Sequence, residues 1–427
     1  MKKVTLFGYG KTTRAIAARL GPCTFYDDRI AVPHRDEVGN RLMPPSLFDS
    51  KNSDIEIPSP GFPPSHPLIK SARHLISEYD LFLSDRGRQY IRQMSHERDP
   101  ASVDRRPSTI DQNRPFTIWI SGTNGKTTTT KMVTHLLKKR GAVCGGNIGT
   151  PLAELDPAAP IWVLETSSFT LHYTKYAKPD LYVLLPVTPD HLGWHESEKA
   201  YISDKLKPLG LMREGEAILL PEAFANRASN GYKIPYKKSE DLAAYFDIDS
   251  SKIVFEGAFL LDALLALAVT KILFDEVDYD AINAFKVDPH RQESLRDAKG
   301  RLWINDSKAT NIDATVQALA PHKNRRVLLI LGGDDKGVDL DPLMESLETY
   351  DIKVFAIGKN AEKIAGLCKK REIECSLCRE LDTAVKQMDK EHTKHSVALL
   401  SPAAASLDQF ASYAQRGEIF KNLISSF

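Results

Sequence analysis

The sequence predicts an α/β protein of three domains, each built on a mostly parallel β-sheet. At 427 residues the chain is longer than a single hydrophobic core supports. Short apolar runs alternate with amphipathic stretches at helical spacing, the pattern of parallel strands joined by right-handed helical crossovers. We expect a Rossmann-like N-terminal domain (1–85), a polar linker (86–115), a central P-loop domain (116–287) and a C-terminal Rossmann-like domain (288–427).

Composition restricts the possible partners and compartment. Lys and Arg total 57 against 56 Asp and Glu, so net charge gives no sign of a nucleic-acid or acidic-membrane partner. No stretch approaches the ~20 apolar residues of a membrane span. Five cysteines fit a reducing, cytoplasmic protein. Cys375 and Cys378, with Cys368 nearby, suggest a metal only weakly, since a second pair at metal-ligand spacing is missing, and we favour structural thiols.

The most informative stretch is Ile118 to Thr130, IWISGTNGKTTTT. An apolar strand runs into a glycine-bearing loop, followed by Lys126, threonines and a helical run. This arrangement presents backbone N–H groups and a helix N-terminus to phosphates. Ile120 stands where the usual motif has its first glycine, and Gly122 comes two residues later. The alternative is a glycine turn that merely opens a surface helix.

The N-terminal domain opens with a strand at Val4 to Phe7, the turn Gly8-Tyr9-Gly10, and a helix. A second strand ends in Asp27 and Asp28, placed as the acidic residue of a dinucleotide site would be. Thr13 occupies the third glycine position, so the match is weak and some other nucleotide is favoured over NAD. Further on, a Pro-rich turn around residues 59–61 is a candidate ligand-facing loop.

In the central domain, two further buried strands end in polar residues. IWVLE ends at Glu165, and LYVLLPVTPDH ends near Asp190 and His191. Because ligands collect at the carboxyl ends of parallel strands, we expect Lys126, Glu165 and His191 to face one crevice. Glu165 is placed as a magnesium carboxylate. Lys205 follows in a helical stretch that Pro208 should interrupt, and from the residues alone it is most simply a solvated lysine.

Two other regions are less specific. The segment 86–115 is polar and arginine-rich, which favours a solvated helix plus linker over a contact to a phosphate-bearing partner. The C-terminal part repeats strand-then-loop units whose polar loops (306–311, 334–336 and 401–406) carry the residues capable of chemistry. We expect these loops to form a second site edge.

The motifs SGTNGKTTTT, GGNIGTP, LETSSF, PDHL, NDSKATN, LGGDDKG and SPAAASLDQF, in this order, resemble the Mur ligases of peptidoglycan precursor synthesis. The resemblance covers nearly the whole chain. The C-terminal motifs are most similar to the family's D-glutamate-adding branch and disfavour the related folylpolyglutamate synthases. The resemblance implies an ATP-dependent ligase that adds D-glutamate to UDP-N-acetylmuramoyl-L-alanine through an acyl phosphate, releasing ADP and phosphate. We expect a monomer in the cytoplasm, with neither nucleic acid nor membrane as a partner.

The resemblance also implies roles for individual residues. Lys126, Glu165, His191, Lys205 and Lys308 would be catalytic. Two Mg²⁺ ions would be held by Thr127, Glu165, His191 and Lys205, the last as a carbamate, and only the family pattern favours Lys205 over Lys207. ATP would contact the loop and the C-terminal domain through Gly122, Thr123, Asn124, Gly125, Lys126, Thr127, Thr128, Arg291, Asp306 and Lys308.

The substrate pockets follow from the same resemblance. D-Glutamate would be held by His191, Thr310, Lys336, Ser406, Leu407 and Tyr413. The uridine nucleotide would be held by Lys11, Thr12, Asp27, Asp28, Arg29, Ser59, Pro60, Gly61, Asn147 and Ser167.

The chain departs from the family pattern where Phe259, Leu260 and Asp262 replace polar residues near the adenine, and where Thr170 replaces a glutamine. Two functions from other classes remain: a regulatory module that hydrolyses ATP to change shape, and an NAD-dependent dehydrogenase. The C-terminal domain has no evident role in the latter.

Overall fold

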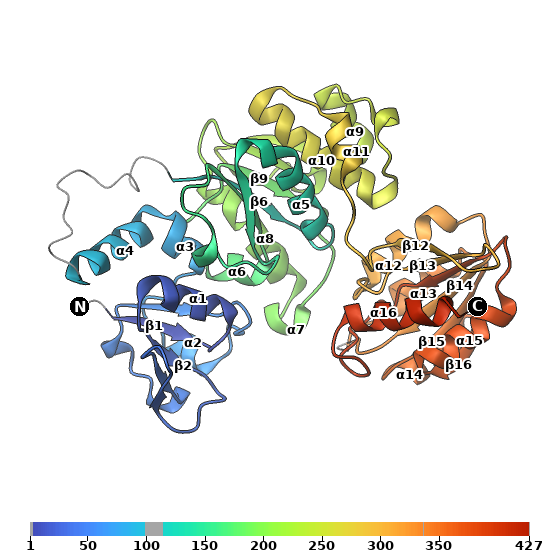
Figure 1. The fold of residues 1–427 in the computed structure, drawn as a ribbon, viewed down its shortest axis with the longest axis horizontal. Helices are drawn as coiled ribbons and strands as arrows, with labels where there is room; N and C mark the ends of the chain where they lie inside the picture. Colours follow the sequence, from blue (N-terminus) through green and yellow to red (C-terminus); the bar gives the residue numbers. More distant parts are fainter. Residues whose placement is uncertain (1–2, 99–113, 336, 427) are drawn as a thin grey trace. The chain divides into compact units, whose positions relative to one another are not determined.

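The computed structural model describes residues 3–98, 114–335 and 337–426. The chain divides into two compact units, Met1–Phe285 and Lys286–Phe427 (Figure 1). The first unit contains two β-sheets and the second contains one. The predicted α/β architecture with three sheets is therefore present.

The N-terminal sheet has the order β3-β4-β2-β1-β5. All its pairings are parallel except that of β3 with β4, so the four parallel strands follow the chain order third, second, first, fourth. This order matches half of a Rossmann fold, as the sequence predicted. The strands are β1 (Val4–Phe7), β2 (Thr24–Tyr26), β3 (His34–Arg35), β4 (Arg41–Met43) and β5 (Ile55–Pro58). The helices are α1 (Lys11–Leu20), α2 (Pro67–Ser71), α3 (Glu78–Leu83) and α4 (Asp85–Arg98).

The central sheet is parallel throughout, with the order β11-β10-β9-β6-β8-β7. Strand order reverses at β6, so a ligand site is expected at its carboxyl end. The strands are β6 (Phe116–Ser121), β7 (Ala142–Gly146), β8 (Ile161–Glu165), β9 (Leu181–Leu184), β10 (Ala217–Pro221) and β11 (Tyr232–Tyr236). The helices are α5 (Lys126–Leu137), α6 (Ser168–Tyr173), α7 (Leu192–His195), α8 (Glu198–Leu211), α9 (Ser239–Phe246), α10 (Gly257–Phe274) and α11 (Tyr279–Ala284).

The inner strands of the central sheet are buried on both faces because apolar residues occupy consecutive positions along them. Ile118 and Ile120 pack into the core shared with α5 and α10, whereas Trp119 packs into the core of the opposite face with Leu206 of α8. Alternating side chains of β6 thus fix the strand that carries the phosphate loop.

Helix α10 is apolar along almost its whole length. Within the described residues it is the one helix long and apolar enough to cross a membrane by composition, which we did not expect from the sequence. Half of that window is buried, and α10 packs against α5 and α9. These contacts are those of a core helix.

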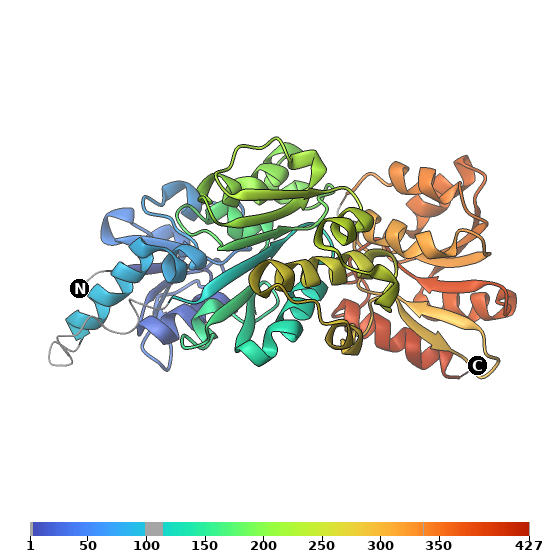
Figure 2. The same ribbon diagram turned by 90° about the horizontal axis from the view of Figure 1, so that it is seen from above.

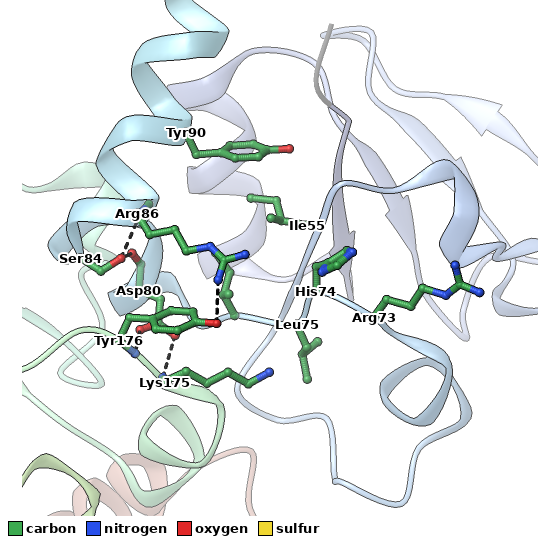
Figure 3. Close-up of a pocket in the computed structure, with 12 residues that line it drawn as sticks. Ile55, Arg73, His74, Leu75, Asp80, Ser84, Arg86, Tyr90, Lys175 and Tyr176 are labelled. Carbon is green, nitrogen blue, oxygen red and sulfur yellow. Dashed lines mark hydrogen bonds between the residues drawn. The ribbon is translucent and has the colours of Figure 1, made fainter. Parts of the chain in front are cut away.

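Within the first unit, the predicted linker begins as helix α4, which packs against α3 and α1, while residues 99–113 lie outside the described part. The Asp80 carboxylate accepts the backbone N–H groups of Lys175, Tyr176 and Ala177 at 2.9, 2.7 and 2.7 Å. A cavity of about 70 Å³ lies beside this contact, where Arg86 bonds Tyr176 (Figure 3).

The C-terminal sheet has the order β12-β13-β17-β14-β15-β16, with only β12 antiparallel. Helices cover both faces of this sheet (Figure 2). The strands are β12 (Glu293–Arg296), β13 (Leu302–Asn305), β14 (Val327–Gly332), β15 (Ile352–Ile357), β16 (Glu374–Arg379) and β17 (Val397–Leu400). The helices are α12 (Ile312–Leu319), α13 (Asp341–Leu347), α14 (Ala361–Lys370), α15 (Leu381–Glu391) and α16 (Tyr413–Ile424).

Candidate active site

The phosphate loop joins β6 to α5 and requires glycine at two positions. Gly122 and Gly125 have φ of +139° and +81°, and a Cβ at either would lie 2.5 Å from an atom of Leu185 or Asp262. Gly125 caps α5, so the first N–H groups of this 12-residue helix point into the loop. The Lys126 Nζ donates to the Thr123 carbonyl oxygen at 2.5 Å. The loop is therefore built to hold an anion.

Glu165 ends β8, the strand beside β6. Its side chain is buried, with 3% of the residue exposed, and Oε1 accepts a hydrogen bond from the Asn147 amide at 2.6 Å. Among the described residues, Oε2 has no hydrogen-bond partner. A buried carboxylate oxygen left without a partner fits a hard cation such as Mg²⁺. Asn147, expected to contact the uridine nucleotide, holds the other oxygen in this structure.

Lys205 is buried rather than solvated, with 1% of the residue exposed. Helix α8 continues through Pro208 to Leu211 and carries Lys205 inward, where Nζ donates to the Gly122 carbonyl oxygen at 2.7 Å. The ammonium also lies 4.6 Å from the Tyr201 ring centre. Burial, and then the charge of Lys126, lower the pKa of Lys205 well below its usual value. The structure thus favours a neutral amine beside the phosphate loop.

His191 follows β9, the strand on the other side of β6, with an exposed fraction of 38% for its side chain. It caps α7 in a left-handed conformation (φ 53°), and its ring lies 4.7 Å from the Phe169 ring. Nε2 is 3.5 Å from an Asp190 oxygen. Lys126, Glu165 and His191 therefore follow three adjacent strands at one edge of the sheet.

The remaining loop residues predicted to contact ATP form the frame of the loop. The Thr123 hydroxyl lies 2.9 Å from both the Thr188 carbonyl oxygen and the Tyr201 hydroxyl. Asn124 and Thr127 are partly buried, whereas Thr128 is buried. A Thr127 hydroxyl on the first turn of α5 is placed as a cation ligand would be.

In the N-terminal domain, the residues predicted to hold the uridine nucleotide surround the end of β1. Asp27 is buried and accepts the Tyr9 N–H at 2.6 Å, and the Arg29 guanidinium holds the pKa of this carboxyl well below its usual range. Asp28 is exposed and lies 3.0 Å from His66.

Three further members of this predicted set contact other parts of the first unit. Lys11 donates to the Gly149 carbonyl oxygen. The Gly61 carbonyl oxygen accepts from the Trp194 indole at 3.3 Å, and Ser59 donates its N–H to Phe7 at 2.8 Å. The loop 59–61, which includes Pro60, thus lies against α7, while Thr12 is partly buried on α1. Ser167 caps α6 by accepting the Thr170 N–H at 3.1 Å.

In the C-terminal unit, two of the residues predicted to contact ATP, Asp306 and Lys308, follow β13, whereas Arg291 precedes β12. Asp306 is buried, accepts the Ser401 hydroxyl at 2.8 Å and the Gln292 N–H at 3.2 Å, and burial raises its pKa to about 7. The Lys308 Nζ lies 4.2 Å from the Tyr413 ring centre. Arg291 is partly buried.

The residues predicted for D-glutamate come from the neighbouring loops. Strand β17 lies between β13 and β14, so the loops after the three strands share one sheet edge. Thr310 and Leu407 are exposed, Leu407 at 72%, whereas Ser406 is buried. Lys336 lies outside the described residues.

Comparison with known proteins decides the family. Residues 120–245 match the model of the Mur ligase middle domain, and residues 290–404 match that of the Mur ligase glutamate ligase domain. The chain is 48% identical over 427 residues to a UDP-N-acetylmuramoylalanine--D-glutamate ligase of Campylobacter jejuni, covering 99% of both chains. It is 43% identical over 442 residues to the ligase of the same name from Helicobacter pylori, again covering 99% of each. The chain belongs to the Mur ligase family.

A solved structure supports the fold of this Mur ligase. The MurF ligase from Thermotoga maritima in complex with ADP superposes with a TM-score of 0.57 at 17% identity, covering 99% of this chain and 95% of that one. At that identity the likeness concerns the fold alone.

Several functional candidates in this Mur ligase were missed from the sequence. Asp262, noted only as a departure near the adenine, is 3% exposed and accepts the Thr129 hydroxyl at 2.9 Å, so it supports the phosphate loop from behind. His172, His195 and Asp204 form a cluster beside Lys205. Arg416, 1% exposed, holds the loops after β13 and β17. Each contact joins elements that are distant in sequence, so no local sequence motif predicts it.

Proposed function

We propose that this Mur ligase uses ATP to join D-glutamate to the carboxyl group of UDP-N-acetylmuramoyl-L-alanine. It acts as a monomer in the cytoplasm, in peptidoglycan precursor synthesis. The full-length relatives carry the name of this activity, and the T. maritima MurF structure is titled as an ADP complex. The observation that carries the proposal is one sheet edge that combines a phosphate loop, an unpartnered oxygen of Glu165 and the buried amine of Lys205.

The reaction proceeds in two steps. A carboxylate oxygen of UDP-N-acetylmuramoyl-L-alanine attacks the γ-phosphorus of ATP, the bond to the β-γ bridging oxygen breaks, and ADP leaves. The product is an acyl phosphate. The amine of D-glutamate then attacks the acyl carbon, a tetrahedral intermediate forms, and its collapse releases phosphate and a proton as the amide forms. Phosphorylation is needed because a carboxylate is a poor electrophile.

Phosphoryl transfer depends on positioning and charge neutralisation. Lys126 and the N–H groups of the loop hold the β- and γ-phosphates. Thr127 and Glu165 would hold one Mg²⁺, and His191 with Lys205 would hold a second. When bound, Mg²⁺ offsets the negative charge of the phosphates and of the acyl phosphate.

Lys205 becomes a metal ligand by carbamylation. Its neutral amine attacks CO₂, a C–N bond forms, and a proton is lost, which converts the side chain to an anionic oxygen donor. Burial supports this step because it favours the free amine. Hard cations accept such oxygen ligands.

The other pockets are assigned by residue type. Arg291, Asp306 and Lys308 contact ATP, with Lys308 at the γ-phosphate or acyl phosphate. Lys336 pairs with a D-glutamate carboxylate, and the remaining contacts come from His191, Thr310, Ser406, Leu407 and Tyr413. The uridine nucleotide is held by Lys11, Thr12, Asp27, Asp28, Arg29, Ser59, Pro60, Gly61, Asn147 and Ser167.

The test is ADP release measured with an amino-acid panel that includes both enantiomers of glutamate. We expect release to require UDP-N-acetylmuramoyl-L-alanine and D-glutamate together, and L-glutamate to be inactive. The second candidate, a regulatory ATPase, predicts the same rate with the amino acid omitted, and that result would reject the ligase assignment.

A further inference from the structure

Four side chains meet next to Lys205 of the candidate active site: His172 of α6, His195 of α7, and Asp204 and Lys207 of α8. We call them the Asp204 cluster. Asp204 Oδ2 lies 2.8 Å from His172 Nδ1 and 3.1 Å from His195 Nδ1, and Asp204 Oδ1 lies 3.1 Å from Lys207 Nζ. The Asp204 and His195 side chains are 7% and 0% exposed. The Asp204 carboxylate and the His195 ring are therefore interior features of the domain, whereas the His172 and Lys207 side chains are 31% and 36% exposed.

The pattern of hydrogen bonds assigns a direction to each contact. A carboxylate only accepts, so both histidines donate from Nδ1. His195 Nε2 forms a second hydrogen bond of this ring, with the Ser168 hydroxyl 2.9 Å away. Lys207 donates further to the carbonyl oxygens of Leu171 and His172. The Asp204 carboxylate, the Nδ1 atoms of both histidines and the Lys207 ammonium thus each have a partner of the right type.

These contacts argue against two other roles for the Asp204 cluster, a metal site and a hydrolase triad. The ligand atoms of His172, His195 and Asp204 lie within 4.8 Å of one another, as in a metal site. However, the Lys207 ammonium sits on the same carboxylate and would repel a cation. Ser168, His195 and Asp204 are also linked by hydrogen bonds in the same way as the serine, histidine and aspartate of a hydrolase triad. Ser168 is only 3% exposed, so a substrate carbonyl could not reach its hydroxyl.

The Asp204 cluster joins the segments that supply three of the four candidate metal ligands, Glu165, His191 and Lys205. Helix α6 begins three residues after Glu165, α7 is capped by His191, and α8 carries Lys205. Phe169 strengthens the contact, since its ring stacks on His195 at 5.6 Å and also lies 4.7 Å from His191.

Asp204 and Lys205 are consecutive on α8 and therefore point about 100° apart. Lys205 reaches the Gly122 carbonyl oxygen of the phosphate loop, while Asp204 reaches the histidines of α6 and α7. A rotation of α8 that displaced the Lys205 amine would break the contacts of Asp204. The Asp204 cluster thus fixes the rotation of α8.

We propose that Asp204 is a positioning residue. Through His172 and His195, it holds Lys205 and His191 in the positions from which they bind the second metal ion. The inference rests on the proposed function, because it takes these two residues as metal ligands. Partners behind metal ligands commonly change metal affinity or activity by 10- to 100-fold when they are removed.

The test compares Asp204→Asn, His195→Phe and Asp180→Asn with the wild-type enzyme. Asn cannot accept from both histidines and Lys207 at once, and Phe keeps the ring contacts of His195 but loses both hydrogen bonds. Asp180 is the matched control: its partly buried carboxylate bonds Arg114 and the Thr117 N–H at the amino end of the same sheet. Thermal unfolding of each variant reports its stability.

Two readouts do not depend on turnover. The first is Mn²⁺ affinity by electron paramagnetic resonance with a non-hydrolysable ATP analogue. The second is the carbamate ¹³C signal of Lys205 in ¹³C-bicarbonate, assigned by its loss in Lys205→Ala. For Asp204→Asn and His195→Phe we expect a weaker carbamate signal and a Kd for Mn²⁺ raised roughly 10- to 100-fold. Asp180→Asn should keep wild-type values.

Wild-type Mn²⁺ affinity and carbamate signal in folded Asp204→Asn and His195→Phe would overturn the proposal. Equal losses in Asp180→Asn at the same loss of stability would also overturn it, since the role would then be structural only. Failure of the proposed function has a separate signature: the wild-type enzyme itself would show no ADP release dependent on D-glutamate.

Discussion

The Nζ atom of Lys205 lies 2.7 Å from the carbonyl oxygen of Gly122, the first glycine of the phosphate loop. A buried amine therefore contacts the segment that we propose to hold the phosphates of ATP. Lys205 is 1% exposed, and its lowered pKa favours the form that reacts with CO₂.

Replacing Lys205 by alanine should remove the oxygen ligand that the proposed carbamate would provide. We expect kcat to fall at least roughly 100-fold, the upper range for groups that act on a bound metal. Acetate or formate should restore part of the activity, because a short carboxylate can occupy the space left by the side chain. The measurement is the rate of ADP release by Lys205→Ala with and without added acetate or formate. Full activity of this variant without added carboxylate would reject the carbamate assignment.

Lys126 is expected to be essential for a different reason. Its ammonium is placed to neutralise the phosphates, and in this structure it bonds the loop carbonyl of Thr123. Lys126→Ala should lower kcat by roughly 100- to 1,000-fold, as for the loss of one preorganised donor. Circular dichroism should be unchanged, since Lys126 is partly buried at the start of α5. Lys131→Ala, five residues further along α5, serves as the control and should keep near-wild-type turnover.

The sequence predicted the fold well because parallel strands with both faces buried are locally visible. The apolar runs that become β6, β8 and β9 each lead into a segment with polar residues, and that position alone placed Lys126, Glu165 and His191 at one sheet edge. Lys205 and Lys207 were harder to separate. Both belong to one helix, and only its rotation in the fold makes Lys205 buried and Lys207 half-exposed.

The Asp204 cluster could not be predicted. Its histidines lie 32 and 9 residues before Asp204, on different helices. Nothing in the local pattern distinguishes His172 or His195 from ordinary surface histidines. Contacts of this kind depend on how three helices dock on a sheet, which residue spacing does not encode.

Arg416 should contribute strongly to the stability of the C-terminal unit. Its guanidinium is buried and donates to the Ser307 hydroxyl at 3.0 Å and to the Ser307 and Ala404 carbonyl oxygens at 2.9 and 3.2 Å. Burial lowers the pKa of Arg416 to about 10, which leaves it protonated at neutral pH.

Arg416→Met removes these donors while keeping an apolar side chain, so buried acceptors lose their partners. We expect a loss of about 2–4 kcal/mol in the free energy of unfolding, measured by urea denaturation. Because the loop after β17 carries Ser406, the KM for D-glutamate should also rise. Arg379→Met is the control: its exposed pair with Glu362 should change stability by no more than about 0.5 kcal/mol. Equal effects of the two substitutions would contradict this role.

Asp306 should make the stability of the C-terminal unit depend on pH. Burial raises the pKa of this carboxyl from 3.8 to about 7, although hydrogen bonds from Ser401 and the Gln292 N–H act in the opposite direction. Between these two pH values the folded state binds a proton that the unfolded state has released. The stabilisation is therefore complete below about pH 4 and is lost as pH rises through about 7.

Asp306→Asn stays neutral at every pH and keeps an acceptor oxygen, so it should lack this dependence. We expect wild-type stability to fall relative to Asp306→Asn between pH 4.5 and 7.5, by up to about 1.4 kcal/mol per pH unit. Urea denaturation of both proteins across this range measures the difference. Asp382→Asn, which changes an exposed carboxylate of the same unit, should follow the wild-type curve. If the unfolding free energies of wild type and Asp306→Asn changed with pH in parallel, Asp306 would be ionised in the folded enzyme across this range. That result would contradict the raised pKa of Asp306.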